Sequence, residues 1–479
     1  MSSSQETRDA VQFWVLIFAT AIGCVYVGRS VVTSYDPIRL LLMMAGVGVA
    51  IGTFAKPKFA MILVVFSMIF SPRIQGAGAA IFKANDLLLF LILIAWMTRT
   101  AIFKGTAFLV TTPLNFPIII FSAVCIVATA LGMLTGTVRT ELRPIFYLVK
   151  YLEYFLLYFM TVNTIDTRED ARRFMRYGWI TAVLVTVFAY TQVASGQRVT
   201  APFDNVIGSA TDSTGQSEPN TFGGYYVVVF GLLLGYFTQT EGTTPLLMIG
   251  SLLFMLTPFL LTQSRASYLG FLAAMIFHIF ATRRRQIFLI LGMGAGVFLV
   301  MLVPKLRDTV VQRVEYTFGK YGDVAGTVAV GDEQVKIEGS TMARIQGWQR
   351  VFTDRLPRRP FLGYGVTGVG LCDAYYPRIA GETGLIGLLC FLWLMSRIWR
   401  CAWGLFRITD QPEEKALALG MLTALVGLMA HAVGANTFIL VRVMEPFWFA
   451  TALMARLLLE AEREQEAAPS NAPVAAPIA

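Results

Sequence analysis

The sequence predicts an all-α polytopic membrane protein with about 12–14 transmembrane helices and a large outer loop that contains short amphipathic helices. Composition is the first reason: apolar residues make up 56% of the 479 residues and charged residues only 14%, whereas a globular domain carries about 25% charged residues. The second reason is a mean hydropathy of +0.63. The third is that apolar runs almost free of charge recur along the whole chain, as expected of helices that cross a hydrocarbon core ~30 Å thick.

Each predicted span is one of these apolar runs. In order they are 11–28, 39–54, 59–71, 86–98, 115–136, 146–163, 176–194, 222–238, 245–262, 267–282, 286–303, 383–403, 415–434 and 440–460. The runs at 59–71 and 86–98 are short, and a buried or re-entrant helix is the alternative for each. The first run lacks the basic flank and cleavage site of a signal peptide, so we expect it to be a retained membrane helix.

These runs divide the chain into four parts. Residues 1–303 form an N-terminal transmembrane bundle with an outer loop at 195–221. Residues 304–382 form a large periplasmic loop, which is too long and polar for a simple connector and too short for an ordinary domain. Residues 383–460 form the C-terminal transmembrane helices, and 461–479, rich in Glu, Ala and Pro, are expected to be a disordered cytoplasmic tail.

Orientation follows from basic residues in short loops, which favour the cytoplasmic side. The run Arg283-Arg284-Arg285 joins two spans and is therefore predicted to be cytoplasmic. With fourteen spans, both termini then lie in the cytoplasm. The loops at 195–221, 263–266 and 304–382 share the outer side.

Composition also bears on partners. The five cysteines show no metal-ligand spacing, and no acidic metal motif is present, so we expect neither a metal nor a cofactor. The net charge of +9 fits cytoplasmic anchoring or an anionic substrate. Nucleic acid is not expected as a partner, because the sequence has no basic stretch interleaved with aromatic residues. Gly363 to Gly368 matches a dinucleotide fingerprint in letters only, because no strand precedes it. We interpret it as a flexible turn.

Two arginines are predicted on the outer side, where basic residues are less frequent in short loops than on the cytoplasmic side. Arg265 occupies a very short turn between two spans, and Arg198 follows another span in a loop that reaches Asn220. A snorkelling arginine is the structural alternative for each. Together they suggest a site for a phosphate-bearing ligand, because guanidinium groups bind phosphate oxygens through paired donors.

The large loop contains a helical stripe of Ile345, Trp348 and Phe352. This stripe predicts a helix lying on the membrane, or one that merely packs, with Arg344 one turn from Trp348 and able to reach a lipid headgroup. Further along, Asp373 stands four residues before Pro377, where we expect the next helix to open; a helix N-cap is its structural alternative.

Histidine is rare in this chain, and His278 and His431 are the only two. His278 falls at the cytoplasmic end of a span and is interpreted as structural. His431 lies near the outer end of a span, so it is either a functional group at membrane depth or a packed, hydrogen-bonded side chain.

Taken in order, these residues resemble the O-antigen ligase and polymerase family, membrane enzymes that build bacterial surface polysaccharides. The resemblance covers the chain from about residue 139 to 460 and rests on three places. They are Arg198 with Pro202-Phe203 and Pro219-Asn220, then Ser264-Arg265, and then the loop pattern of Arg344, Trp348, Pro360, Gly363, Gly365, Asp373, Tyr376, Glu382 and Gly384-Leu385-Ile386-Gly387.

The resemblance implies a metal-independent, inverting glycosyl transfer at the periplasmic face of the bacterial inner membrane. The donor is a glycan on undecaprenyl diphosphate, and the acceptor is a hydroxyl of a glycan or a lipid-linked sugar. Membrane lipids and polysaccharide-assembly proteins are the other implied partners. Asp373 is the implied base and Arg198 and Arg265 the groups that stabilise the departing diphosphate; the implied substrate-binding residues are Arg344, Trp348, Asn220, Tyr376, Arg378, Glu382 and His431.

The chain departs from the family at one position. Ligase-type members carry a histidine nine residues before the glutamate, where this sequence has Asp373, and the asparagine that follows is Ala374. This favours a polymerase of lipid-linked repeats, or another polysaccharide ligase, over a ligase acting on lipid A-core. A transporter of lipid-linked glycans and a non-catalytic assembly scaffold are the rival hypotheses. A transporter site would lie at mid-membrane on broken helices.

Overall fold

The structure is a computed structural model. It describes residues 48–49, 51–53, 56–70, 73–75, 81–102, 109–138, 142–194, 199–202, 206–207, 219–302, 307–308, 311, 324–330, 333–370 and 372–467. The predicted span 11–28 and most of 39–54 lie outside these residues.

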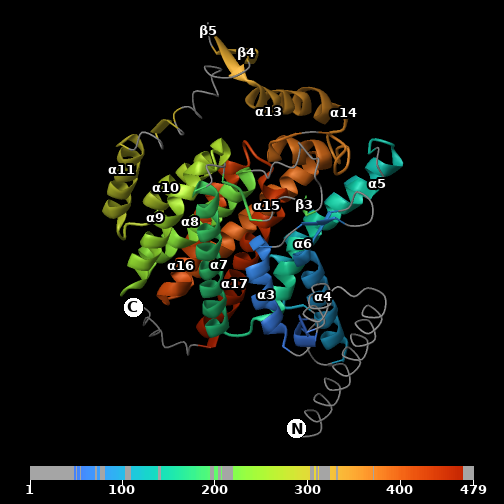
Figure 1. Cartoon of the computed structure of the whole chain (residues 1–479). Coiled ribbons are helices and arrows are strands. Elements are labelled where there is room, and N and C mark those ends of the chain that lie inside the picture. The colour runs from blue at the N-terminus through green and yellow to red at the C-terminus, as the bar shows by residue number, and fades with distance from the viewer. Residues whose placement is uncertain are drawn as a thin grey trace, which may run out of the picture.

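Long helices form a bundle, and a smaller layer covers one end of it (Figure 1). The bundle helices are α3 (Pro57–Phe70), α4 (Ala84–Ile102), α5 (Asn115–Leu134), α6 (Leu142–Thr164), α7 (Arg168–Ala194), α8 (Pro219–Gln239), α9 (Thr244–Leu261), α10 (Arg265–Ala281), α11 (Gln286–Leu302), α15 (Tyr375–Ile408), α16 (Pro412–His431) and α17 (Val441–Ala467). Each predicted span from 59–71 onward coincides with one of these helices, so the two short runs are helical as well.

Seven helices of the described part are long and apolar enough to cross a membrane, and three shorter apolar helices accompany them. The protein is therefore an all-α polytopic membrane protein. The choice between twelve and fourteen spans stays a prediction, because the first two segments fall largely outside the described residues.

Helix α8 occupies the centre of the bundle and is buried on nearly all sides. Small residues allow its neighbours to approach it closely, as is usual between membrane helices. A Cβ atom at Gly231 would lie 2.6 Å from the backbone nitrogen of Ala424 in α16, and one at Gly235 would overlap the carbonyl oxygen of Ala416. These glycines bring α8 and α16 together, and this pair forms the scaffold for the outer ends of both helices.

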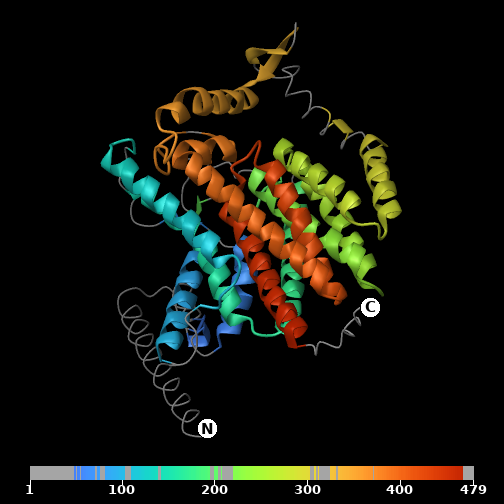
Figure 2. The same ribbon diagram turned by 180° about the vertical axis from the view of Figure 1, so that it is seen from behind.

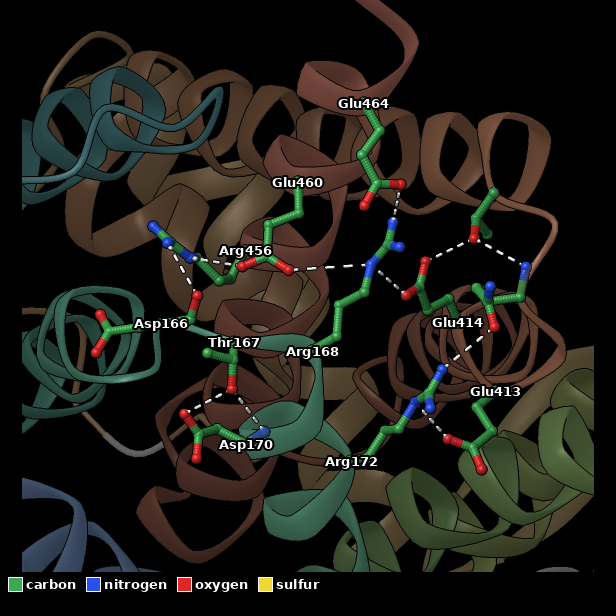
Figure 3. A network of polar contacts seen from close by, with 12 residues as sticks. Asp166, Thr167, Arg168, Asp170, Arg172, Glu413, Glu414, Arg456, Glu460 and Glu464 are labelled. Carbon is green, nitrogen blue, oxygen red and sulfur yellow. Dashed lines mark hydrogen bonds and ion pairs between the residues drawn. The ribbon is translucent and has the colours of Figure 1, made fainter. Parts of the chain in front are cut away.

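The turns predicted to be cytoplasmic gather at one end of the bundle, which we call the inner end. There a network of ion pairs joins α7, α16 and α17 (Figure 3). Arg168 lies 2.9 Å from both Glu414 and Glu464, and Arg172 lies 2.8 Å from Glu413. Glu464 belongs to α17, so the prediction of a disordered tail from residue 461 is wrong for 461–467; residues 468–479 lie outside the described part.

The opposite end, which we call the outer end, carries the predicted outer loops. Within the large loop, the expected amphipathic helix is α13 (Gly339–Gln349), which continues through the π-helical segment η1 (Arg350–Arg355) into α14 (Leu356–Arg358). A hairpin of β4 (Val324–Val330) and β5 (Glu333–Glu338), which the sequence analysis did not predict, precedes them. The hairpin and helices α13 and α14 lie above the bundle in Figure 1.

One boundary of the large loop differs from expectation. The large loop ends at Ala374 rather than at residue 382, because α15 begins at Tyr375 and already includes Pro377. Short strands also pair two outer loops: β1 (Arg73–Gln75) pairs with β2 (Ile81–Lys83) and, in parallel, with β3 (Val206–Ile207). Figure 2 shows α15, in orange, crossing the back of the bundle from the outer layer to the inner end.

Candidate functional site

Helix α15 is interrupted near its outer end. Gly384 has φ 69° and ψ −169°, a conformation open essentially only to glycine. The break frees backbone groups that would otherwise bond within the helix. The amide of Leu385 donates to the carbonyl of Pro360 at 2.7 Å, and that of Ile386 donates to the carbonyl of Phe361 at 3.3 Å. The large loop thus supplies acceptors where the helix lacks them, which backbone at membrane depth requires.

The same loop also supplies the donors. The amide of Tyr364 donates to the carbonyl of Gly381 at 3.0 Å, and that of Gly365 donates to the carbonyl of Glu382 at 2.8 Å. Gly363 and Gly365 adopt positive φ values of 62° and 85° to make this approach. The prediction of a flexible turn is therefore wrong, because the turn is bound on both sides of the break. Because the loop uses these groups, the break offers little of the free backbone that transporters present to a substrate.

A buried ion pair fixes the loop further. Glu382 is fully buried, and its Oε1 accepts from the Arg378 guanidinium and from the Thr367 amide, each at 3.0 Å. The Arg378 guanidinium also lies over the ring of Tyr147, 5.8 Å from its centroid. We expected Arg378 and Glu382 to bind substrate directly. Their mutual contact ties α15 to its loop, and a direct contact of either residue with substrate stays a prediction.

His431 anchors a chain of hydrogen bonds at the outer ends of α8, α10 and α16. Ser264 donates to Asn220 Oδ1 at 2.6 Å, and Ser267 donates to Ser264 at 2.7 Å. Because a hydroxyl has one proton to give, Ser267 must accept from His431 Nε2, which lies 3.2 Å away. The other ring nitrogen, Nδ1, lies 2.7 Å from Thr437 Oγ1.

This chain shows how His431 is packed, and a role of its side chain at the site stays a prediction. The side chain is completely buried and bonded at both ring nitrogens, so it is a packed, hydrogen-bonded group. The chain also fixes the side chain of Asn220, because Oδ1 accepts from Ser264 and the Nδ2 amide is left as a donor. Asn220 is only partly buried, and its amide is available to an outer ligand.

The turn at 432–440, between α16 and α17, brings the arginine-bearing end of α10 to the site. A Cβ atom at Gly434 would lie 3.4 Å from Cβ of Ala266, the residue after Arg265. Arg265 opens α10 directly after Ser264, whose side chain caps the helix by accepting from the Ser267 amide. Arg265 is partly buried and directly follows Ser264 of this hydrogen-bonded chain.

The turn at 432–440 also holds residues 372–375, which we call the aspartate segment. Asn436 Nδ2 donates to the carbonyl of Cys372 at 2.7 Å, and the Tyr375 amide donates to the carbonyl of Ala432 at 3.1 Å. Asp373 is exposed between these two anchors. The N-cap of α15 is the next residue, whose extended backbone is not accompanied by any side-chain capping bond, so the interpretation of Asp373 as a helix cap is wrong.

Burial raises the pKa of the Cys372 thiol, so the cysteine beside Asp373 stays protonated and is a poor nucleophile.

Helix α13 closes the site from above. The ring of Trp348 stacks on Phe352 with centroids 5.5 Å apart and lies 6.3 Å from the ring of Tyr376. A Cβ atom at Gly347 would lie 3.5 Å from Cys372 Sγ. The predicted apolar stripe therefore packs on the aspartate segment, and it places Arg344, one turn before Trp348, on the same short helix.

The structure thus brings most of the predicted site residues to the outer end, around the turn at 432–440. Asn220, Arg265 and His431 approach it from one side, and Asp373 and Tyr376, with α13 above them, approach it from the other. Arg198 lies outside the described residues. The amide of its neighbour Val199 donates to the carbonyl of Leu261, at the end of α9.

Sequence reasoning missed several residues that complete this end of the bundle. Ser264, Ser267 and Thr437 are short polar residues whose partners come from other helices, and nothing local distinguishes them. Arg442 is buried and donates to the carbonyl of Pro202 at 2.6 Å, which ties α17 to the outer loop after Arg198. A charged residue at the start of a span was the available signal.

A second polar group, partly buried, joins α4 and α6. Lys150 of α6 pairs with Asp86 of α4 and, at 2.8 Å, with Glu153. Charges inside a predicted span were again the signal. Among the described residues, no group of three or more His, Cys, Asp or Glu side chains could hold a metal ion. No protein-family model and no curated protein sequence matches this chain.

Proposed function

We propose that the protein is a membrane glycosyltransferase of surface polysaccharide biosynthesis. It would polymerise or transfer undecaprenyl-diphosphate-linked glycans to a sugar hydroxyl at the periplasmic face of the inner membrane. One observation carries the proposal: residues 45 to 153 positions apart in the chain, Asn220, Arg265 and Asp373, are held around one turn at the outer end. Cationic, amide and carboxylate groups together suit a diphosphate leaving group and a hydroxyl nucleophile.

The proposed reaction assigns one task to each group. The acceptor hydroxyl oxygen attacks the anomeric carbon of the donor, and the bond from that carbon to the diphosphate oxygen breaks. The electron pair of that bond goes to the diphosphate, where Arg265 stabilises the charge that develops. The exposed carboxylate of Asp373 takes the hydroxyl proton. The Asn220 amide, oriented by the histidine chain, donates to a phosphate or sugar oxygen.

A reconstituted assay tests the proposal directly. Proteoliposomes that contain the full chain are given lipid-linked repeats extracted from a strain lacking the protein. We expect longer glycans to form and lipid diphosphate to be released. Movement of repeats across the membrane without any change in glycan length would indicate the rival transporter. Transfer only to added lipid A-core would indicate a ligase of that class.

Arg265 provides a sharper prediction. Arg265→Ala should lower turnover by about 100-fold, the lower range found when a donor that stabilises a developing oxyanion is removed. Arg265→Lys should retain part of the activity, because it keeps the charge but loses the planar fork. Turnover is measured in the reconstituted assay, and protein abundance should stay normal. Full activity in Arg198→Ala/Arg265→Ala would rule out the diphosphate-binding role.

Sidedness is tested without knowing the substrate. In a cysteine-free variant, Ser213→Cys and Ala329→Cys should react with a membrane-impermeant thiol reagent in cells with a permeabilised outer membrane. Arg284→Cys, at the inner end, should not react. Labelling at Arg284→Cys alone would show that the orientation is the reverse of the predicted one, and the proposed site would then not be periplasmic.

A further inference from the structure

A cavity of about 280 Å³ lies between α3, α7, α8, α9, α16 and α17, away from the candidate site. Its walls are mainly apolar and include Val65, Met68, Val229, Leu233 and Phe449. The volume is close to the lower end of the ~300–1,000 Å³ usual for small-molecule sites. A ligand bound in such a cavity gains contacts with the lining atoms on all sides.

The depth of the cavity matches one leaflet of a membrane. On α7 its lining extends from Arg172 to Ala182, which is about 15 Å along a helix that rises 1.5 Å per residue. That distance is half of a hydrocarbon core ~30 Å thick. The cavity therefore runs from the inner end of the bundle to about the middle of the membrane.

The inner mouth of the cavity is polar and carries two arginines. Arg172 is paired with Glu413, 2.8 Å away, and both belong to the network at this end of the bundle (Figure 3). Arg176 lies one turn further along α7, lines the same cavity and is exposed. Within the part of the chain that the structure describes, Arg176 makes no hydrogen bond or ion pair. Arg176 therefore presents an exposed guanidinium at the mouth that no carboxylate of the described residues contacts directly.

We propose that this cavity binds an anionic phospholipid of the inner-end leaflet, with one acyl chain inside it and the phosphate of the headgroup at Arg176. An apolar cavity one leaflet deep suits an acyl chain, and an exposed arginine without a direct ion pair at headgroup level can bind the phosphate of a lipid. The bound chain fills the space between α3, α7 and α9 and stabilises their packing, because a ligand that binds only the folded state adds to its stability. The site is separate from the donor site at the outer end.

The proposal is tested on the full chain, delipidated in detergent, by native mass spectrometry and thermal unfolding with added lipid. Phosphatidylglycerol should bind saturably and raise Tm more than phosphatidylcholine with the same acyl chains. Arg176→Gln should weaken phosphatidylglycerol binding about fivefold, from ~1 kcal/mol per basic residue at a membrane surface. It should leave phosphatidylcholine binding unchanged.

A matched pair of glycine variants tests the cavity itself. Gly178 lines the cavity, and a Cβ atom there would meet nothing within 4 Å, so Gly178→Leu should fill the space and abolish saturable lipid binding. Gly250 in α9 is equally unobstructed but does not line the cavity, and Gly250→Leu should bind phosphatidylglycerol as the wild type does.

Several results would overturn the proposal. One is that folded Gly178→Leu binds phosphatidylglycerol as tightly as the wild type does. Another is that Arg176→Gln leaves the affinity for phosphatidylglycerol unchanged. A third is that glycerol phosphate alone displaces the lipid. Stronger binding of an isoprenyl phosphate than of phosphatidylglycerol would also overturn it, by assigning the cavity to the tail of a donor lipid. If Gly178→Leu fails to fold, the Arg176→Gln comparison still decides, because that side chain is exposed.

Discussion

Asp373→Asn should fold and insert normally but make no polymer, with turnover lowered by about 100- to 10,000-fold. That is the range lost when a general base is removed. Asparagine keeps the size and one side-chain oxygen of aspartate but cannot accept the hydroxyl proton. Because Asp373 is exposed and the cap position of α15 belongs to Ala374, the substitution removes no structural hydrogen bond that would confuse the result. Turnover is measured with lipid-linked repeats, and glycan length is read by gel electrophoresis.

Asp354→Asn is the matched control for this experiment. Asp354 is an acidic residue of the same loop, and it pairs at the surface with Arg358 at 2.5 Å. Exposed pairs of this kind contribute about 0–1 kcal/mol, so Asp354→Asn should leave glycan length and amount unchanged. Equal polymer from Asp373→Asn and Asp354→Asn would remove Asp373 from the chemistry. Loss of polymer in both would indicate a general effect of loop charge.

Gly384→Ala should prevent stable folding of the outer end. The backbone conformation at this break costs a residue with a side chain about 1–3 kcal/mol. The added Cβ atom would also overlap the carbonyl oxygen of Phe361, and such overpacking costs about 1–3 kcal/mol more. The two bonds that Leu385 and Ile386 make to the loop depend on this approach. We therefore expect a lower Tm in detergent, a smaller monodisperse fraction and no polymer.

Gly404→Ala is the control in the same helix. A Cβ atom there would lie 3.6 Å from Leu458 Cδ1, an ordinary contact, and alanine favours a helix over glycine by about 1 kcal/mol. Gly404→Ala should therefore keep or raise the Tm and retain activity. A Gly384→Ala protein with wild-type Tm and polymer would mean that the loop does not need the break in α15.

Some features of the site could be predicted from local sequence. Arg265 stands out because it lies in the short turn that separates two apolar runs. The apolar stripe of α13 is visible because its residues recur at helical spacing. Asp373 and Tyr376 stand out only through their place in the family pattern. The contacts of Glu382 and His431 could not be predicted, because each side chain bonds to a partner on another segment. The Thr367 amide and the Ser267 hydroxyl supply these partners.

The sequence by itself determined the class of the protein and the positions of its spans, because crossing a hydrocarbon core requires only a run of apolar residues of sufficient length. It also placed Arg265 and Asp373 in loops of the same predicted side. Only the tertiary structure decided which side chains meet. Asn85 donates to Glu445, 360 positions away, the large loop completes the break in α15, and six helices line a cavity. Such contacts depend on how helices pack, and the apolar pattern that specifies each helix is nearly the same whichever neighbour it packs against.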